Sequence, residues 1–315
     1  KILQKEAGNA FITFLWPNKS EDIPDNRDIK LVILQPNEKE DTAKQWLEKK
    51  GNTFRTYKNT IIFALADPVG TGTFKDELKT YLALKEIAEE IEKEKDSIIK
   101  EKSAEISQKI KRITEDFSYN ARKMYNILVI GNEKISLGQP TVGKESLSNW
   151  YKLQLESKEK IASNIHYRYI IKKFLEEKES METKVIIDQF YKDPSFVMPE
   201  SIEVVKRSIQ QGITDGVFGL GYIENDGIDK ETLKFKINIP TTSISFGDTE
   251  ILIDKENALN LIKEIKEPIT VTSGPDTDGR DTGGGEVAPD TPLKGPKKYQ
   301  KIRLIIENIP SSKKR

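Results

Sequence analysis

The feature that most constrains the fold is a long stretch, residues 74–130, that contains neither glycine nor proline. Its apolar side chains recur every three or four residues, beginning with Phe74, Leu78 and Tyr81. This is the spacing of one face of an α-helix. Apart from isoleucines, residues 89–102 are almost all Glu and Lys, which is typical of a solvated outer face. The pattern predicts one helix, or two abutting helices, forming a long and antiparallel helical arm.

The N-terminal region, residues 1–73, contains three apolar runs with the length of β-strands, at residues 10–16, 29–34 and 59–66. Prolines separate these runs, and a helical stretch at residues 41–50 lies between the second and the third. Because the runs are apolar throughout, we expect strands that are buried on both faces, as in an α/β sheet.

Residues 131–182 are predicted to form a segment of short helices. The module that follows, residues 183–240, has the element order of a winged helix: helix, turn, helix and a two-stranded hairpin. Those elements are predicted at residues 183–191, 194–199, 201–212, 217–223 and 232–239. A winged helix that is purely structural, without DNA contact, remains an alternative.

The C-terminal region is predicted in three parts. Residues 241–272 form a strand and helix extension, and residues 273–297, rich in Gly, Asp, Thr and Pro, form a flexible linker. Residues 298–315 open a C-terminal β element. Because a lone strand cannot form a domain, we expect the chain to be part of something longer. The predicted class is therefore α+β and multi-module.

Composition excludes several classes of protein. The chain of 315 residues has no cysteine and one histidine, which leaves no disulfide framework, no thiolate catalysis and no Cys-based or multi-His metal centre. Lys and Arg balance Asp and Glu at 51 each, so we expect no broad basic coat. No apolar run is long enough to predict a membrane span, and the first residues do not show the pattern of a signal peptide. The rich use of Lys, Glu and Ile favours a thermophilic, cytoplasmic origin.

One motif resembles a phosphate-binding loop. Residues 138–144 match G-x-x-x-x-G-K and end in Lys144, but Glu145 stands where a true P-loop has the Ser or Thr that holds Mg²⁺. A carboxylate at that position is unfavourable beside phosphates, and a loop that leads into a helix is the simpler interpretation. Two further residues are candidates for nucleotide contact: Asp67, which ends a buried strand, and Arg55, which precedes it. Ordinary turn and surface roles are the alternatives, and we expect no catalytic set.

The second helix of the winged-helix-like module carries the candidate nucleic-acid contacts, Lys206, Arg207, Gln210 and Gln211. Arg, Lys and Gln side chains suit phosphate and base-edge contacts. Because only two of the four are charged, we expect weak and salt-sensitive binding of DNA.

Several stretches together resemble the C-terminal part of a family of large prokaryotic AAA+-type ATPases, often encoded beside DNA methyltransferases and helicases in loci that look like phage-defence or modification islands. The stretches are EDIPDNRDIKLVILQP, FRTYKNTIIFALAD, LKTYLALKEI and ESIEVVKRSIQQGITDGVFGLGYI. The resemblance implies that the nucleotide-binding core, with its ATP and Mg²⁺, lies upstream of this sequence. It therefore implies no cofactor and no catalytic residue here.

Three functional hypotheses follow. The first is a non-catalytic fragment of a nucleic-acid-associated ATPase, acting as a coupling and DNA-contacting module. The second is a nucleotide-hydrolysing enzyme that uses residues 138–144 directly. The third is a structural scaffold for partner proteins or for other copies of the ATPase.

Overall fold

The computed structural model describes residues 2–93, 97–140, 145–225 and 227–266. Its first part is built on a five-stranded sheet with the strand order β1-β2-β5-β6-β7. The first three strands run parallel, and β6 and β7 continue the sheet in antiparallel fashion. The strands are β1 (Ile12–Leu15), β2 (Lys30–Ile33), β5 (Ile61–Leu65), β6 (Ile127–Ile130) and β7 (Glu133–Ser136).

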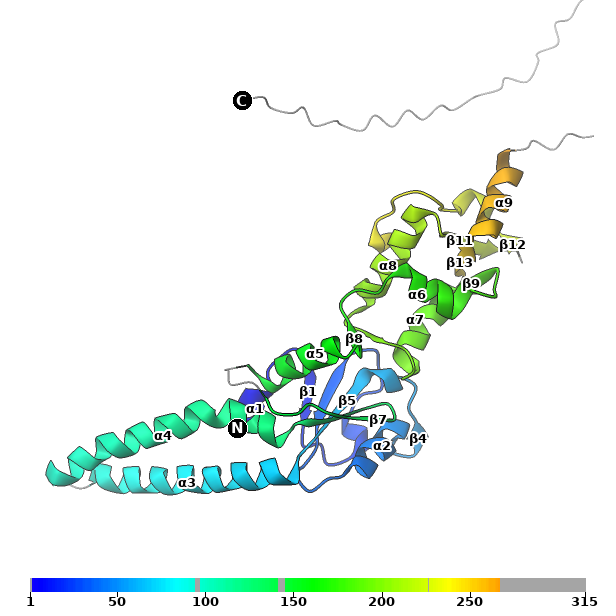
Figure 1. Cartoon of the computed structure of the whole chain (residues 1–315). Helices are drawn as coiled ribbons and strands as arrows, with labels where there is room; N and C mark the ends of the chain where they lie inside the picture. Colours follow the sequence, from blue (N-terminus) through cyan, green and yellow to red (C-terminus); the bar gives the residue numbers. More distant parts are fainter. Residues whose placement is uncertain (1, 94–96, 141–144, 226, 267–315) are drawn as a thin grey trace, which may run out of the picture. The chain divides into compact units, whose positions relative to one another are not determined.

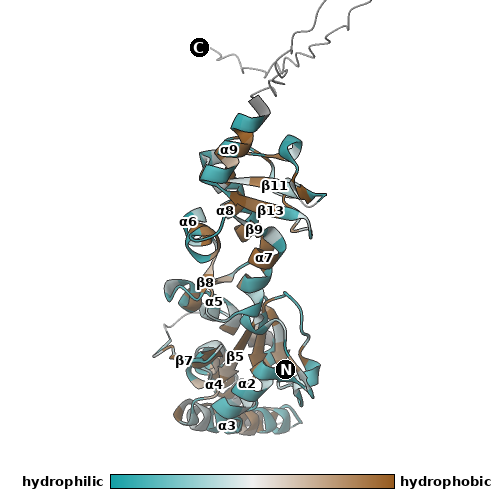
Figure 2. Cartoon of the chain, turned by 90° about the vertical axis from the view of Figure 1, so that its right-hand side faces the viewer, coloured by the Kyte–Doolittle hydropathy of each residue, from teal (hydrophilic) through white to brown (hydrophobic). Residues whose placement is uncertain are grey.

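Both faces of this sheet are covered, as the three apolar runs predict. Every residue of β2 and β5 is buried, and alternate side chains enter two hydrophobic layers, one on each face of the sheet, which together form the first core. One layer is closed by α2 (Glu40–Glu48), the other by the base of the arm together with α1 (Ile2–Ala7) and α5 (Leu147–Ser157). In Figure 2 β5 is coloured as a hydrophobic strand. A short hairpin, β3 (Lys49–Lys50) and β4 (Thr53–Phe54), follows α2.

The helical arm consists of two helices, α3 (Pro68–Lys93) and α4 (Ser97–Met124), which lie side by side in Figure 1. Edge-to-face contacts of Phe74 and Tyr81 with Phe117 join them near the sheet. Of the two alternatives predicted for this stretch, one helix or two, the structure has two. The arm is an insertion between β5 and β6, so the sheet takes its strands from both sides of it. The first helix begins before the predicted stretch, at Pro68, because proline is favoured at the first position of a helix.

A second core lies in residues 161–266. Its sheet has the order β12-β11-β13-β9, and all three strand pairings in it are antiparallel. The helices α6, α7 and α8 contribute to the same core. The elements are β8 (Ile161–Ala162), α6 (Tyr167–Ile170) with a π-turn (Ile171–Leu175), β9 (Ser180–Glu182), α7 (Thr183–Lys192), β10 (Met198–Pro199), α8 (Ile202–Asp215), β11 (Phe218–Glu224), β12 (Gly227–Ile228), β13 (Glu250–Asp254) and α9 (Lys255–Lys266).

The predicted strand at residues 232–239 is wrong. The long partner of β11 is β13, and residues 232–239 contribute only an isolated bridge between Leu220 and Lys234. Lys236 has a positive φ of 56°, which interrupts an extended run, and Phe235 and Ile239 are buried instead of pairing.

The end of α8 also differs from the prediction. The helix continues past Gly212 and ends at Gly216, which has the left-handed conformation of a C-cap glycine. Gly212 lies inside the helix because the ring of Phe218 packs where a Cβ would be, only 2.1 Å away.

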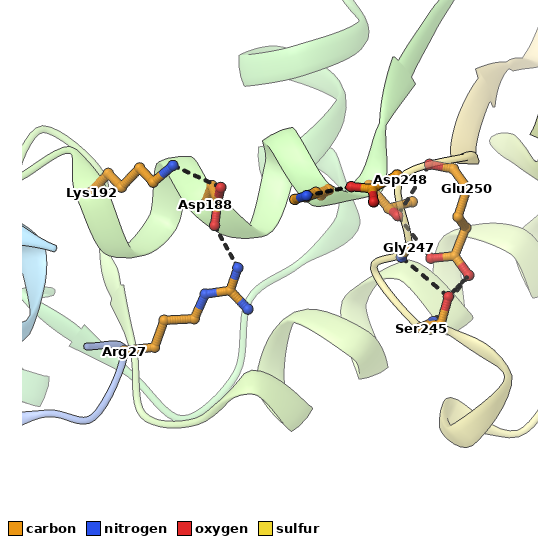
Figure 3. A network of polar contacts seen from close by, with 9 residues as sticks. Arg27, Asp188, Lys192, Ser245, Gly247, Asp248 and Glu250 are labelled. Carbon is orange, nitrogen blue, oxygen red and sulfur yellow. Dashed lines mark hydrogen bonds and ion pairs between the residues drawn. The ribbon is translucent and has the colours of Figure 1, made fainter. Parts of the chain in front are cut away.

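Polar contacts join the two cores. The side chain of Asn59, directly before β5, is buried and donates to the carbonyl oxygens of Phe190 (2.8 Å) and Phe196 (3.0 Å). Figure 3 shows Arg27 and Lys192 both directed at Asp188, at 2.5 and 2.7 Å. The α+β class is confirmed. The predicted linker and terminal β element lie outside the described residues.

Candidate nucleic-acid interface

The four candidate contacts of α8 lie together on its outer side. The opposite side of the helix packs into the core through Val204, Val205, Ser208, Ile209, Gly212 and Ile213. This leaves Arg207 and Gln211 exposed, with Lys206 and Gln210 half-buried at the edge. The amphipathic spacing of the helix therefore determines which polar side chains it presents.

Each of these four side chains has a partner within the chain. Lys206 Nζ lies 3.5 Å from the Glu203 carboxylate, and Arg207 Nη2 donates to the carbonyl of Ser163 at 3.0 Å. Gln210 donates to the carbonyl of Ile239 at 2.5 Å, and Gln211 to Asp215 at 2.9 Å. Two carboxylates thus balance the two cations of α8, so the helix presents a polar face without net charge.

The segment between β11 and β13 is held against α8. The amide of Lys236 donates to the carbonyl of Ile213 (2.9 Å), in the last turns of the helix. The same segment is anchored by Glu250, which is fully buried. Its carboxylate accepts from Thr183 Oγ1 (2.7 Å) and from the amides of Ser245 (3.0 Å) and Phe246 (2.9 Å). Figure 3 shows Glu250 beside Ser245. These hydrogen bonds therefore fix the segment between β11 and β13 beside α8.

Arg55 lies far from α8 and inside the first core. It is buried, and its guanidinium donates to the carbonyl oxygens of Trp46 (2.6 Å), Ser20 (2.7 Å) and Ile23 (3.1 Å). Burial lowers the pKa of Arg55, against the raising effect of Asp25. With its donors directed at backbone oxygens, Arg55 joins α2 to the loop before β2. A phosphate would have to displace those bonds.

Asp67 has the turn role that its neighbour Pro68 suggests. Its carboxylate accepts from the amide of Gly70 at 2.9 Å, and its own amide donates to the carbonyl of Met124 at 2.7 Å. The first contact caps α3, and the second joins the start of the arm to its end. Both contacts use Asp67 to fix the base of the arm.

The P-loop-like motif has a strand before it and a helix after it, but not those of a P-loop. The strand is β7, an antiparallel strand at the edge of the sheet. The helix, α5, begins after Ser146, whose Oγ accepts from the amide of Asn149. The carbonyl oxygen of Glu145 accepts a hydrogen bond from the guanidinium of the buried Arg122. Lys144 lies outside the described residues.

The contacts that join the two cores were not predicted from the sequence. Asn59, Arg27 and Asp188 are polar residues without a motif, and their partners lie more than 100 residues away. The only indication in the sequence was the position of Asn59 at the start of an apolar run. A polar side chain in such a position needs a hydrogen-bond partner if it is buried. Within the described residues there is no cluster of His, Asp or Glu that could hold a metal ion, and no helix meets the length and hydropathy of a membrane span.

Residues 7–135 match a family model described as the DUF499 third domain. The matched range begins before β1 and ends in β7, so it covers the five-stranded sheet together with the arm inserted in it. No curated protein and no solved structure matches the chain.

Proposed function

We propose that residues 161–266 contain a winged-helix module that contacts duplex DNA through α8. The observation that carries this proposal is the order of elements: α6, β9, α7, α8, β11 and β13, with β13 between β9 and β11 in the sheet. A winged helix has this order, with its first strand between the first two helices and its third helix presented to DNA. In this chain that third helix is α8, and the long segment between β11 and β13 is the wing.

We propose further that the chain is a non-catalytic coupling module of a larger nucleic-acid-associated ATPase. The two ends of β5 support this role. Asn59, before β5, is bonded to the winged-helix module, and Asp67, after β5, caps the arm. A displacement of the arm would therefore be transmitted along one buried strand. On the basis of the resemblance to AAA+-type ATPases, we propose in addition that the parent protein has an ATPase core that uses ATP and Mg²⁺, and that it is cytoplasmic.

Duplex binding is tested by fluorescence anisotropy at low salt. The wild type is compared with Lys206→Ala/Arg207→Ala, and the control is Lys111→Ala/Arg112→Ala, an adjacent exposed Lys-Arg pair on α4. We expect weak binding by the wild type, with a dissociation constant of about 10⁻⁴–10⁻⁶ M near physiological salt. The α8 variant should bind more weakly, and each lost phosphate contact should reduce the salt slope by about 0.9. The control variant should keep the wild-type slope.

A second candidate is a scaffold that binds partner proteins. It is favoured by the neutral charge of α8, where Glu203 and Asp215 hold Lys206 and Gln211. If the wild type and the α8 variant bound the duplex with equal affinity, and circular dichroism were unchanged, the scaffold would become the favoured function.

The remaining alternative is nucleotide hydrolysis through residues 138–144. Glu145 in place of Ser or Thr, and an antiparallel edge strand before the loop, count against it. We expect no Mg²⁺-dependent binding in a titration with a fluorescent ATP analogue. Micromolar binding that Lys144→Ala abolishes would reverse this ranking.

A further inference from the structure

The hairpin β3–β4 presents an aromatic ring to solvent. Phe54 is 72% exposed, compared with 41% for Trp16, the other aromatic side chain with a large exposed surface in the described part of the chain. A phenylalanine exposed to this extent gains nothing from burial in the fold. Its position therefore calls for an explanation outside the packing of the core.

The ring is mounted on a rigid base. Arg55, the residue that follows β4, is buried and anchored to backbone carbonyls, whereas Phe54 at the end of β4 is exposed. The amide of Arg55 donates to the carbonyl of Glu48 at 2.9 Å, which closes the hairpin. The turn is fixed by a bond of 2.8 Å from the Gly51 amide to Ser20 Oγ. A ring held in this way loses little conformational entropy when a ligand binds.

One cation lies over this ring, and others follow in the sequence around it. Residues 49–58, KKGNTFRTYK, contain four basic residues and no acidic one, in a chain whose net charge is zero. Lys49 Nζ lies 5.3 Å from the centroid of the Phe54 ring. Lys58 is paired with Glu48, whereas Lys49 and Lys50 form no ion pair among the described residues. The nearest carboxylate to the turn is that of Glu21, beside Gly51.

We propose that the β3–β4 hairpin binds single-stranded nucleic acid, with a base stacked on Phe54 and an adjoining phosphate near Lys49, the lysine paired with Phe54 across the hairpin. Sequence-tolerant binding of single strands uses this combination of an aromatic platform and flanking cations. A single ring between lysines also offers too little apolar area for a stable protein interface. The proposal is independent of the duplex contact through α8.

The test is anisotropy of a labelled 16-mer of deoxythymidine at low salt. We expect Phe54→Ala to weaken binding at least fivefold, since stacking of one base contributes about 1–3 kcal/mol, where 1.4 kcal/mol is tenfold. Phe54→Trp should keep or increase the affinity, and its fluorescence should be quenched by the bound base. The matched control is Leu82→Ala, which removes an apolar side chain that is 56% exposed on α3 and should change nothing.

Two further measurements separate stacking from charge. An abasic oligonucleotide of the same length should bind the wild type as weakly as the thymidine oligomer binds Phe54→Ala. Lys49→Ala/Lys50→Ala should reduce the salt slope by about 0.7 for each lost phosphate contact. The α8 variant should bind the 16-mer with the affinity of the wild type. The outcome for the hairpin is therefore independent of whether α8 contacts duplex DNA. Absence of binding, or equal affinities for the wild type and a folded Phe54→Ala, would overturn the proposal.

Discussion

Arg55 in the first core and Arg207 on α8 are the same residue type in two different settings. Arg55 is buried and donates to several backbone carbonyls, whereas Arg207 is exposed and donates to one. A buried guanidinium whose donors are used holds the fold together, and its loss leaves acceptors unpaired. An exposed one with a single partner can exchange that partner for a phosphate at little cost. Number of partners and burial, rather than residue type, therefore separate structural cations from available ones.

Replacing Arg55 should have the largest effect. Arg55→Ala removes the donors of at least three buried carbonyl contacts, so we expect a loss of about 3–5 kcal/mol in the free energy of unfolding. Urea denaturation followed by circular dichroism measures it. Arg207→Ala, the matched change on α8, should stay within about 0.5 kcal/mol. A similar loss for both variants would contradict the distinction between the two settings.

Lys30 extends the comparison to pH. It is buried at the start of β2, where Nζ donates to the carbonyls of Asn26 (2.7 Å) and Asp28 (2.6 Å). Burial lowers the pKa of Lys30 from 10.5 to about 8, although the carboxylates of Asp28 and Asp25 raise it. The unfolded chain therefore holds this proton more tightly than the folded chain. Below pH 8 the burial of the charged Lys30 ammonium destabilises the folded state, and the free energy of unfolding rises as the pH increases above 8 and the folded protein loses this proton.

The expected rise in the free energy of unfolding is about 3 kcal/mol between the two pKa values, at about 1.36 kcal/mol per unit. The rise is measured by urea denaturation from neutral pH to pH 10. Above pH 10 the buried Tyr191, whose pKa is raised to about 12, would lower the free energy of unfolding, because the unfolded chain then loses the tyrosine proton first. Lys30→Met should flatten this part of the profile. A wild-type profile as flat as that of the variant would show that Lys30 titrates normally.

The same contrast between enclosed and open positions exists within one helix. A Cβ on Gly70 would lie 2.4 Å from the carbonyl oxygen of Lys123, whereas nothing lies within 4 Å of the corresponding position on Gly72. We expect Gly70→Ala to destabilise the fold by about 1–3 kcal/mol through overpacking at the base of the arm. Gly72→Ala should stabilise it by about 0.5–1 kcal/mol, because alanine favours the helix. Thermal denaturation of both variants tests this, and equal signs would contradict it.

Local patterns predicted the parts of the fold that depend on neighbouring residues. The arm, the buried strands and α7 were visible as periodic or continuous apolar runs. The alternation of residues 232–239 was misleading because the sheet instead pairs β11 with Glu250–Asp254, a choice made by contacts across the module. The strands β8 and β10, of two residues each, are too short to leave a pattern in the sequence.

The candidate residues show the same limit. The side of α8 that carries Lys206 and Arg207 followed from the spacing of Val204, Val205 and Ile209. The burial of Arg55 did not follow from sequence, because its partners are backbone carbonyls of residues up to 35 positions away. Contacts with backbone oxygens need no particular residue type in the partner, and so they leave no motif.

Asp67 occupies an intermediate position, half-buried and used by the backbone. Asp67→Ala removes the acceptor for the Gly70 amide, and we expect a loss of about 1 kcal/mol. Asp67→Asn keeps an acceptor of the same shape and should cost only a few tenths of that. Chemical denaturation of the two variants gives the difference. If Asp67→Asn were as damaging as Asp67→Ala, the carboxylate charge, rather than the cap, would matter at this position.

A small effect on stability is also expected when the two cations of α8 are removed. Lys206 and Glu203 form an i,i+3 pair at 3.5 Å, and pairs of this kind contribute about 0.2–0.5 kcal/mol. Arg207 donates to one carbonyl oxygen, that of Ser163. Water can donate to this oxygen when the arginine side chain is removed. Lys206→Ala/Arg207→Ala should therefore change the free energy of unfolding by less than about 1 kcal/mol, whatever it does to duplex binding. A loss above about 2 kcal/mol would mean that these cations stabilise the module as Arg55 stabilises the first core, and reduced duplex binding by this variant would then no longer identify α8 as the contacting helix.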